Sequence, residues 1–148
     1  MPVSPRLAFV QCLSPSGLHR MAYHEWGDAQ NPRVLVCVHG LSRTGRDFDV
    51  LAQALCNDYR VICPDVVGRG RSDWLADPKG YVLSQYASDM VTLLARLNAE
   101  SVDWFGTSMG GLIGIGLAGL PKSPIRKLLL NDVGPRITAQ SMERIGAY

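Results

Sequence analysis

The sequence predicts an α/β protein with a doubly wound, mostly parallel sheet, and three observations support this fold class. Short apolar runs rich in β-branched residues recur along the chain. They alternate with longer segments whose apolar residues are spaced as on one face of a helix, which is typical of βαβ units. Two further apolar stretches near the N-terminus are joined by a tight turn, which adds an antiparallel hairpin to the sheet.

Strands are expected in six places. Residues 6–13 and 18–26 form the hairpin around the turn Ser14-Pro15-Ser16-Gly17. The run 34–38 is continuously apolar, which predicts a strand that is covered on both faces. In a doubly wound, mostly parallel sheet, ligands are expected at the carboxyl ends of the strands. The other three strands are expected at residues 60–63, 101–105 and 125–130.

Three helices are expected between these strands. In residues 47–56 the apolar side chains recur at helical spacing, and Asp47 stands where an N-cap is preferred. Residues 84–98 show the clearest amphipathic pattern, and Ser84 is placed to cap them. The third helix is expected over 108–119. Since no internal repeat or low-complexity segment interrupts this order, the chain is interpreted as part of a single domain.

The composition excludes several classes of protein. The 148 residues are 47% hydrophobic, which is ample for one buried core. Fifteen Lys and Arg against thirteen Asp and Glu give a formal net charge of +2, spread along the chain. There is no basic stripe for nucleic acid, and no charge pattern that favours a membrane surface. The N-terminus does not resemble a signal peptide.

The cysteines give no indication of a metal centre. The chain has four, without a CxxC pair or the spacing of metal ligands. Cys37 lies inside an apolar run, where a reduced and buried thiol is expected. We therefore expect a reducing, cytoplasmic setting and no metal.

The strongest chemical motif is Gly106-Thr107-Ser108-Met109-Gly110, which matches G-x-S-x-G between a predicted strand and a predicted helix. The glycines Gly106 and Gly110 allow a turn so tight that Ser108 is strained and its hydroxyl exposed. The helix that follows directs unpaired N–H groups and its positive end at the same point. A glycine-rich turn with an incidental serine is the alternative. The strand before the motif and the helix after it favour a nucleophile at Ser108.

A second motif, His39-Gly40-Leu41, directly follows the strand at 34–38. An acyl-transfer enzyme needs two preorganised donors for the negatively charged oxygen of its tetrahedral intermediate, the oxyanion. We assign the backbone N–H groups of Leu41 and Met109 to that role. His39, beside Gly40, is interpreted as a residue that organises the loop rather than as a base.

A third segment runs from Pro64 to Ser72, directly after the strand expected at 60–63. Together with the two motifs above, it makes the sequence resemble the α/β-hydrolase superfamily over essentially all of its 148 residues. The third segment is similar to the superfamily's D-x-x-G-x-G-x-S loop, which is structural and borders the active site. The resemblance implies the α/β-hydrolase fold, a serine hydrolase without cofactor, and a small carboxylic ester, lactone or related acyl compound as substrate. A carbon–carbon bond hydrolase of this fold and a non-catalytic binding module that retains it are the alternatives. The segments are His39-Gly40-Leu41-Ser42-Arg43, Pro64-Asp65-Val66-Val67-Gly68-Arg69-Gly70-Arg71-Ser72 and Gly106-Thr107-Ser108-Met109-Gly110-Gly111.

The sequence departs from the superfamily at the catalytic triad, which runs along the chain as Ser, then Asp or Glu, then His. No histidine follows Ser108. His19 and His24 are expected near a sheet edge, in contact with solvent. Asp132, after the last predicted strand, is the candidate acid, and the alternative is that it orders the loop that follows. A histidine outside this chain would be the base, so the 148-residue chain is predicted to be nearly inactive.

These observations lead us to interpret the chain as the N-terminal part of one α/β-hydrolase domain, truncated before the lid and the last strands. The core is expected over 1–137 and the start of the lid over 138–148. The strand at 125–130 is then an open sheet edge, which predicts a complementing C-terminal chain or self-association. No nucleic-acid or membrane partner is expected.

One further motif is interpreted as structural. Residues 114–119 match G-x-G-x-x-G, which can bind dinucleotides at a strand-to-helix turn. Here the motif falls inside the helix predicted over 108–119. Its small residues are therefore expected to let that helix pack closely on the sheet.

Overall fold

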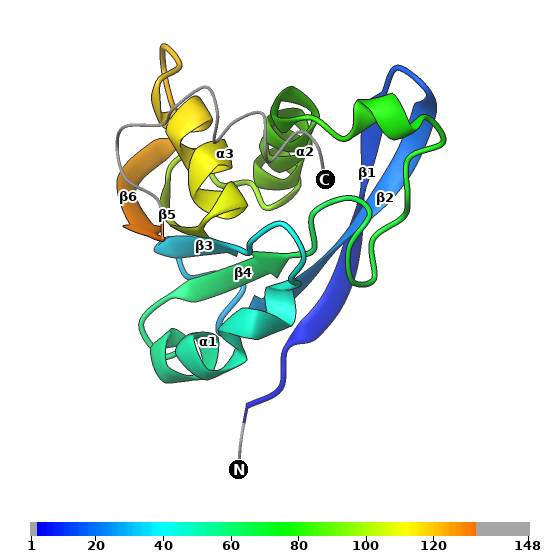
Figure 1. The fold of residues 1–148 in the computed structure, drawn as a ribbon. Coiled ribbons are helices and arrows are strands. Elements are labelled where there is room, and N and C mark those ends of the chain that lie inside the picture. The colour runs from blue at the N-terminus through cyan, green and yellow to red at the C-terminus, as the bar shows by residue number, and fades with distance from the viewer. Residues whose placement is uncertain (1–2, 133–148) are drawn as a thin grey trace.

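The computed structural model describes residues 3–132, which form one six-stranded sheet with helices on both faces (Figure 1). The strands lie in the order β1-β2-β4-β3-β5-β6. β3 is parallel to β4 and to β5, and β5 is parallel to β6, whereas β2 is antiparallel to both β1 and β4. The predicted fold class, a mostly parallel sheet led by an antiparallel hairpin, is confirmed. The strands are β1 (Arg6–Ser14), β2 (Gly17–Trp26), β3 (Val34–Val38), β4 (Arg60–Pro64), β5 (Val102–Thr107) and β6 (Ile125–Asn131).

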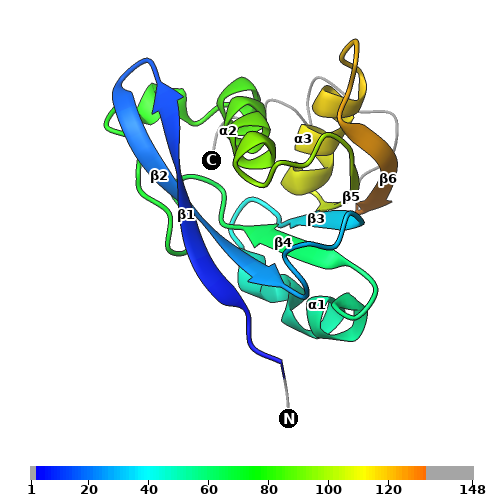
Figure 2. The same cartoon turned by 180° about the vertical axis from the view of Figure 1, so that it is seen from behind.

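The helices divide between the two faces of the sheet. Figures 1 and 2 show α1 on one face and both α2 and α3 on the other. Successive residues of a strand point to opposite faces, so a strand covered on both sides must be apolar throughout. In β3, Val36 packs in the core under α2 and α3, and Cys37 packs in the smaller core under α1. The helical elements are η1 (Gly45–Phe48), α1 (Asp49–Leu55), η2 (Pro78–Gly80), α2 (Leu83–Arg96) and α3 (Met109–Ala118).

Two predicted helix caps are wrong. Asp47 lies inside the 3-10 turn η1, whose N-cap is Thr44, and the Asp47 carboxylate binds the Arg43 guanidinium at 2.8 Å instead. Ser84 lies in the first turn of α2, which begins one residue earlier and has no side-chain cap. In both places the helical segment starts before the polar residue that the sequence offers as a cap. The Thr44 hydroxyl caps η1 by accepting the Arg46 N–H at 3.3 Å, and Val82 stands at the N-cap of α2.

The predicted exposure of two histidines is also wrong. His19 is 3% exposed and His24 is 6% exposed. His24 lies where β2 is paired both with β1 and with β4, whereas His19 is paired with β1 alone and is covered by α2. The His19 Nε2 atom lies 2.7 Å from a carboxylate oxygen of Asp89 on α2. Burial lowers the pKa of His24 below its ordinary value. Both rings therefore belong to the interior of the protein.

The structure confirms that Cys37 is a buried free thiol. All four cysteines, Cys12, Cys37, Cys56 and Cys63, are buried free thiols. Within residues 3–132, no helix is long and apolar enough to cross a membrane. The predicted start of a lid at 138–148 lies outside the described residues.

The G-x-G-x-x-G sequence lies in α3 and its C-cap, as expected. A Cβ at Gly114 would lie 2.6 Å from the Trp104 Nε1 atom on β5, so only glycine permits this approach of α3 to the sheet. A Cβ at Gly116 would meet nothing within 4 Å. Close packing therefore explains Gly114 but not Gly116.

Candidate active site

Ser108 occupies the single-residue turn between β5 and α3. Its backbone has φ 51° and ψ −113°, a conformation that residues with a side chain rarely adopt and that costs free energy. The Ser108 N–H donates to the Asn131 carbonyl at 3.0 Å, so the end of β6 supports the turn. Ser108 is partly exposed. The structure thus places it in the strand–turn–helix geometry that a G-x-S-x-G nucleophile requires.

The two glycines of the motif are required by close backbone contacts. A Cβ at Gly106 would lie 2.5 Å from the Gly110 carbonyl oxygen. A Cβ at Gly110 would lie 2.0 Å from the Val38 carbonyl oxygen, at the end of β3. The absence of both side chains therefore lets α3 begin directly against the ends of β3 and β5.

The loop after β3 passes beside Ser108. A Cβ at Gly40 would lie 3.6 Å from the Ser108 Cβ, so Gly40 and Ser108 are in contact. Met109 is the first residue of α3, where backbone N–H groups have no partner within the helix. Among the hydrogen bonds of residues 3–132, none is donated by the backbone N–H of Leu41 or of Met109. Within residues 3–132 these two N–H groups therefore have no acceptor, and Leu41 follows Gly40 in the chain as Met109 follows Ser108.

Both ring nitrogens of His39 are engaged by the backbone. Its Nε2 accepts the Val66 N–H at 2.9 Å. Its Nδ1 lies 2.7 Å from the Gly40 carbonyl, which can only accept, so Nδ1 carries the proton and the ring is neutral. Burial lowers the pKa of His39, which favours the same neutral form. The ring has no free nitrogen with which to accept a proton from Ser108.

The hydrogen bond between His39 and the Gly40 carbonyl instead restricts the direction of the Leu41 N–H. The Gly40 carbonyl and the Leu41 N–H belong to one planar trans peptide, in which they point in opposite directions. The Arg43 N–H also donates to the Gly40 carbonyl, at 3.2 Å. With that carbonyl held by two donors, the Leu41 N–H cannot rotate freely. This geometry supports the interpretation of His39 as a loop-organising residue.

The segment from 64 to 72 is attached to the same loop by Asp65. Its buried carboxylate accepts the Gly45 N–H at 2.7 Å and the Arg71 N–H at 2.9 Å. Its backbone carbonyl accepts the Ser72 hydroxyl. The sequence identified this segment as structural, and the contacts show that Asp65 joins it to the chain just beyond the His39–Leu41 loop.

The remaining candidates lie at different distances from the serine. Asp132 directly follows β6, is exposed and has φ 60°, and its neighbour Asn131 is the acceptor of the Ser108 N–H. It is therefore at the same edge of the sheet as Ser108.

His19 and His24 both lie on β2, three strands away from β5, which corresponds to about 14 Å. Neither can reach the Ser108 hydroxyl.

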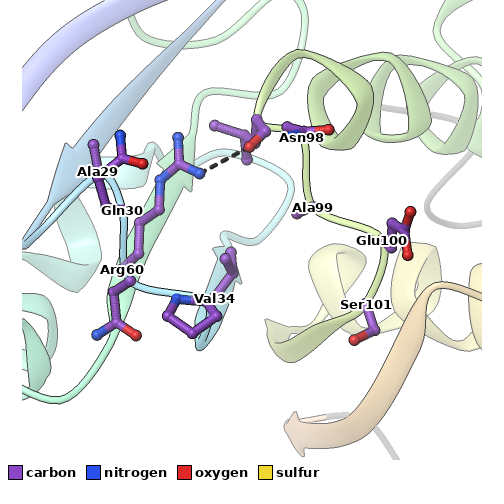
Figure 3. Close-up of a pocket in the computed structure, with 11 residues that line it drawn as sticks. Ala29, Gln30, Val34, Arg60, Asn98, Ala99, Glu100 and Ser101 are labelled. Carbon is purple, nitrogen blue, oxygen red and sulfur yellow. Dashed lines mark hydrogen bonds between the residues drawn. The ribbon is translucent and has the colours of Figure 1, made fainter.

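A cavity of about 610 Å³ lies elsewhere, at the amino-terminal ends of the strands (Figure 3). Val34 at the start of β3 and Ser101 before β5 line it, together with Arg60, whose guanidinium donates to the Leu97 carbonyl at 2.8 Å. Since Ser108 lies at the carboxyl ends of the strands, this cavity is at the opposite edge of the sheet from the candidate site.

The structure also brings together a polar cluster that sequence spacing could not reveal. Potential ligand atoms of Cys12, His19 and Asp89, from β1, β2 and α2, lie within 4.8 Å of one another. The other Asp89 oxygen accepts the Gln85 side-chain amide at 2.7 Å. Burial, followed by the Asp89 charge, raises the pKa of Cys12 to about 12. Because the Asp89 oxygens are already hydrogen-bonded, the cluster serves to attach the β1–β2 hairpin to α2.

Comparisons with known proteins agree with this geometry. Residues 33–144 match the family model for the alpha/beta hydrolase fold. The chain is 78% identical over 148 residues to a 3-hydroxybutyrate-oligomer hydrolase of Cupriavidus necator, covering 100% of this chain and 50% of that protein. It thus spans about half the length of this relative.

Solved structures show the same relation. The crystal structure of a hydrolase from Rickettsia typhi superposes with a TM-score of 0.86 at 35% identity, over 96% of this chain and 53% of that one. An alpha/beta hydrolase from Novosphingobium aromaticivorans superposes with a TM-score of 0.81 at 39% identity, over 98% of this chain and 50% of that one. The family model, these relatives and the turn at Ser108 lead to one assignment: the chain belongs to the α/β-hydrolase fold family.

Proposed function

We propose that this chain supplies the nucleophile and the oxyanion donors of a serine hydrolase that cleaves carboxylic esters, and that its substrates are short oligomers of 3-hydroxybutyrate. The observation that carries the proposal is the strained turn at Ser108, which places this serine in contact with Gly40. It is supported by the N–H groups of Leu41 and Met109, which donate no hydrogen bond within residues 3–132. The choice of substrate is supported by 78% identity to a 3-hydroxybutyrate-oligomer hydrolase.

In the proposed mechanism the Ser108 hydroxyl oxygen attacks the ester carbonyl of the oligomer. The oxyanion that forms accepts hydrogen bonds from the Leu41 and Met109 N–H groups, which are fixed before the reaction begins. Collapse of the intermediate releases the next hydroxybutyrate unit as an alcohol and leaves an acyl group on Ser108. Water then hydrolyses the acyl-enzyme and restores the serine.

Proton transfer requires a group that this chain does not supply. His39 has both nitrogens engaged, and His19 and His24 lie about 14 Å away, so the base is a histidine outside residues 1–148. Asp132 is our candidate for the acid that orients that histidine. Without the base, only a rate enhancement of roughly 10³- to 10⁴-fold over water is expected, from the oxyanion donors and binding alone.

The same reasoning implies a complementing partner. Within the described residues β6 pairs only with β5, and Leu129 on this strand is 52% exposed. We propose that a C-terminal portion, as in the longer relatives, continues the sheet at β6 and brings the histidine. We also propose a cytoplasmic location, supported by the four buried cysteines, which form no disulfide in the described part of the chain.

The test uses residues 1–148 joined to the remaining half of the Cupriavidus relative. We expect this completed protein to release 3-hydroxybutyrate from its dimer and trimer and to react at Ser108 with a fluorophosphonate. The Ser108→Ala variant should do neither. Ser101→Ala, an exposed serine at the opposite edge of the sheet, is the matched control and should behave as the unaltered protein.

Two results would contradict the proposal. Rapid stoichiometric labelling of the isolated 148-residue chain, with turnover of a nitrophenyl ester, would show that no outside base is needed. Cleavage of a vinylogous diketo acid in preference to every ester would show that the completed protein acts on carbon–carbon bonds.

A further inference from the structure

The side chain of Arg69 connects the 64–72 segment to the loop that carries the first oxyanion donor. Its Nε donates to the Leu41 carbonyl at 2.9 Å. Its Nη1 donates to the Val67 carbonyl at 2.9 Å and to the Tyr86 hydroxyl at 3.2 Å. The guanidinium carbon lies 5.9 Å and 5.3 Å from the ring centroids of Tyr81 and Tyr86. The guanidinium is thus fixed in place by two carbonyls and two aromatic rings.

Leu41 is consequently held on both sides of its Cα. On one side the Gly40 carbonyl, in the same peptide as the Leu41 N–H, is bound by His39. On the other side the Leu41 carbonyl is bound by Arg69. Because both flanking peptide planes are fixed, the Leu41 N–H is aimed before substrate binds. A donor fixed in this way stabilises the developing oxyanion without reorganising during the reaction.

Within the part of the chain that the structure describes, the charge of Arg69 has no carboxylate partner. Within residues 3–132 the ion pairs formed by arginines involve Arg6, Arg43, Arg46, Arg60 and Arg126, and none involves Arg69. Arg69 is also only partly exposed, so its charge is less screened by solvent than that of a surface arginine. The positive charge is therefore available to act at the loop that it binds.

We propose that Arg69 is a positioning residue for the oxyanion hole: it fixes the Leu41 peptide so that the Leu41 N–H meets the oxyanion. This inference rests on the proposed esterase function and adds to it a residue that does not touch substrate. An arginine is required because its planar guanidinium can bind the Leu41 and Val67 carbonyls at once, whereas a lysine ammonium cannot reproduce that fixed geometry.

The test compares Arg69→Lys and Arg69→Gln in the completed protein, with nitrophenyl butyrate and the hydroxybutyrate dimer as substrates. Arg71→Lys is the matched control, because Arg71 lies two residues away with an exposed side chain. We expect both Arg69 variants to lower kcat about 10- to 100-fold, with KM changed by less than about twofold. Arg71→Lys should leave both constants unchanged. Concentrations of active enzyme are determined by fluorophosphonate titration, so partial unfolding does not count as lost kcat.

A second measurement separates positioning from a merely structural role. A trifluoromethyl ketone mimics the tetrahedral intermediate after addition of Ser108, whereas a non-hydrolysable ether analogue of the dimer mimics bound substrate. We expect the Arg69 variants to bind the ketone more weakly by the factor lost in kcat, and to bind the ether as tightly as before. Unchanged kcat per titrated site, or unchanged affinity for the ketone, would overturn the assignment.

The two proposals fail in different ways. A completed protein that cleaves nitrophenyl butyrate but not hydroxybutyrate oligomers overturns the substrate proposal, and the Arg69 comparison is then decided on nitrophenyl butyrate. A completed protein that cleaves no ester overturns both proposals.

Discussion

Gly110 offers a sharp test of the geometry at the serine turn. In the structure a Cβ at this position would lie 2.0 Å from the Val38 carbonyl oxygen and 2.9 Å from that of His39. Ordinary contact begins near 3.4 Å, so the Gly110→Ala variant must move α3 away from β3 by roughly 1.4 Å. Since both partners are backbone atoms at the end of a buried strand, neither can simply rotate aside.

We expect Gly110→Ala to lower the free energy of unfolding of the completed protein by about 3 kcal/mol, the upper range for overpacking a core. The effect on catalysis should be larger than the effect on folding. A displacement of about 1 Å between a nucleophile and the groups that act with it can cost roughly 100-fold in rate. Ser108 is the N-cap of α3 and the proposed donor Met109 is its first residue, so both are affected when α3 moves. Urea denaturation followed by circular dichroism, and kcat per titrated site, measure the two effects.

Gly116→Ala is the matched control, because it makes the same chemical change in the same helix. A Cβ there would meet nothing within 4 Å. Replacing glycine by alanine in an exposed helix interior should stabilise the protein by about 0.5–1 kcal/mol and leave kcat unchanged. If Gly110→Ala proved as stable and as active as Gly116→Ala, α3 would not begin against β3, and our account of Ser108 would be refuted.

Three other predictions follow from the contacts described. Asp65→Ala removes a buried carboxylate that accepts two backbone N–H groups, and should lower the free energy of unfolding by about 3 kcal/mol in urea denaturation; a value below 1 kcal/mol would contradict the contacts. The folded-state pKa of His39 and of His24 is lowered by burial, so the unfolded chain binds more protons; the free energy of unfolding should therefore fall as pH drops below about 6.5, and constant stability from pH 8 to pH 5 would be evidence against neutral, buried rings. Leu129→Lys places a charge on the exposed strand β6 and should reduce self-association of the 148-residue chain in analytical ultracentrifugation, with less than about 0.5 kcal/mol change in stability.

Most of the fold could be predicted because hydrophobic periodicity differs between its strands and its helices. The continuous run at β3 required cover on both faces, and the structure provides it with α1 on one side and α2 and α3 on the other. Helix starts were predicted less well. Asp47 and Ser84 are good capping residues in isolation, but another capping residue, Thr44, stands at the start of η1, and α2 begins at Leu83 without any side-chain cap.

The burial of His19 could not be predicted, because its cause is a long-range contact. Its partner Asp89 lies 70 residues later in the sequence. A histidine in a hairpin strand is ordinarily solvated, and nothing in the local pattern indicates that α2 will cover it. The same holds for Arg69, whose acceptor Leu41 lies 28 residues earlier. The motifs identified the segments of the site but not the side-chain contacts that join them.

The way these contacts are distributed along the chain bears on how the enzyme could be divided. The contacts that shape the nucleophile turn and aim the Leu41 N–H come mostly from residues 38–110, with Asn131 as the outer support of Ser108. In the proposed mechanism, proton transfer depends on a histidine outside residues 1–148. That proposal places electrostatic stabilisation and proton transfer in separate parts of the protein, which would meet at the carboxyl edge of the sheet. A C-terminal portion that pairs with β6 would then need only to deliver one imidazole beside Ser108 and the two proposed amide donors.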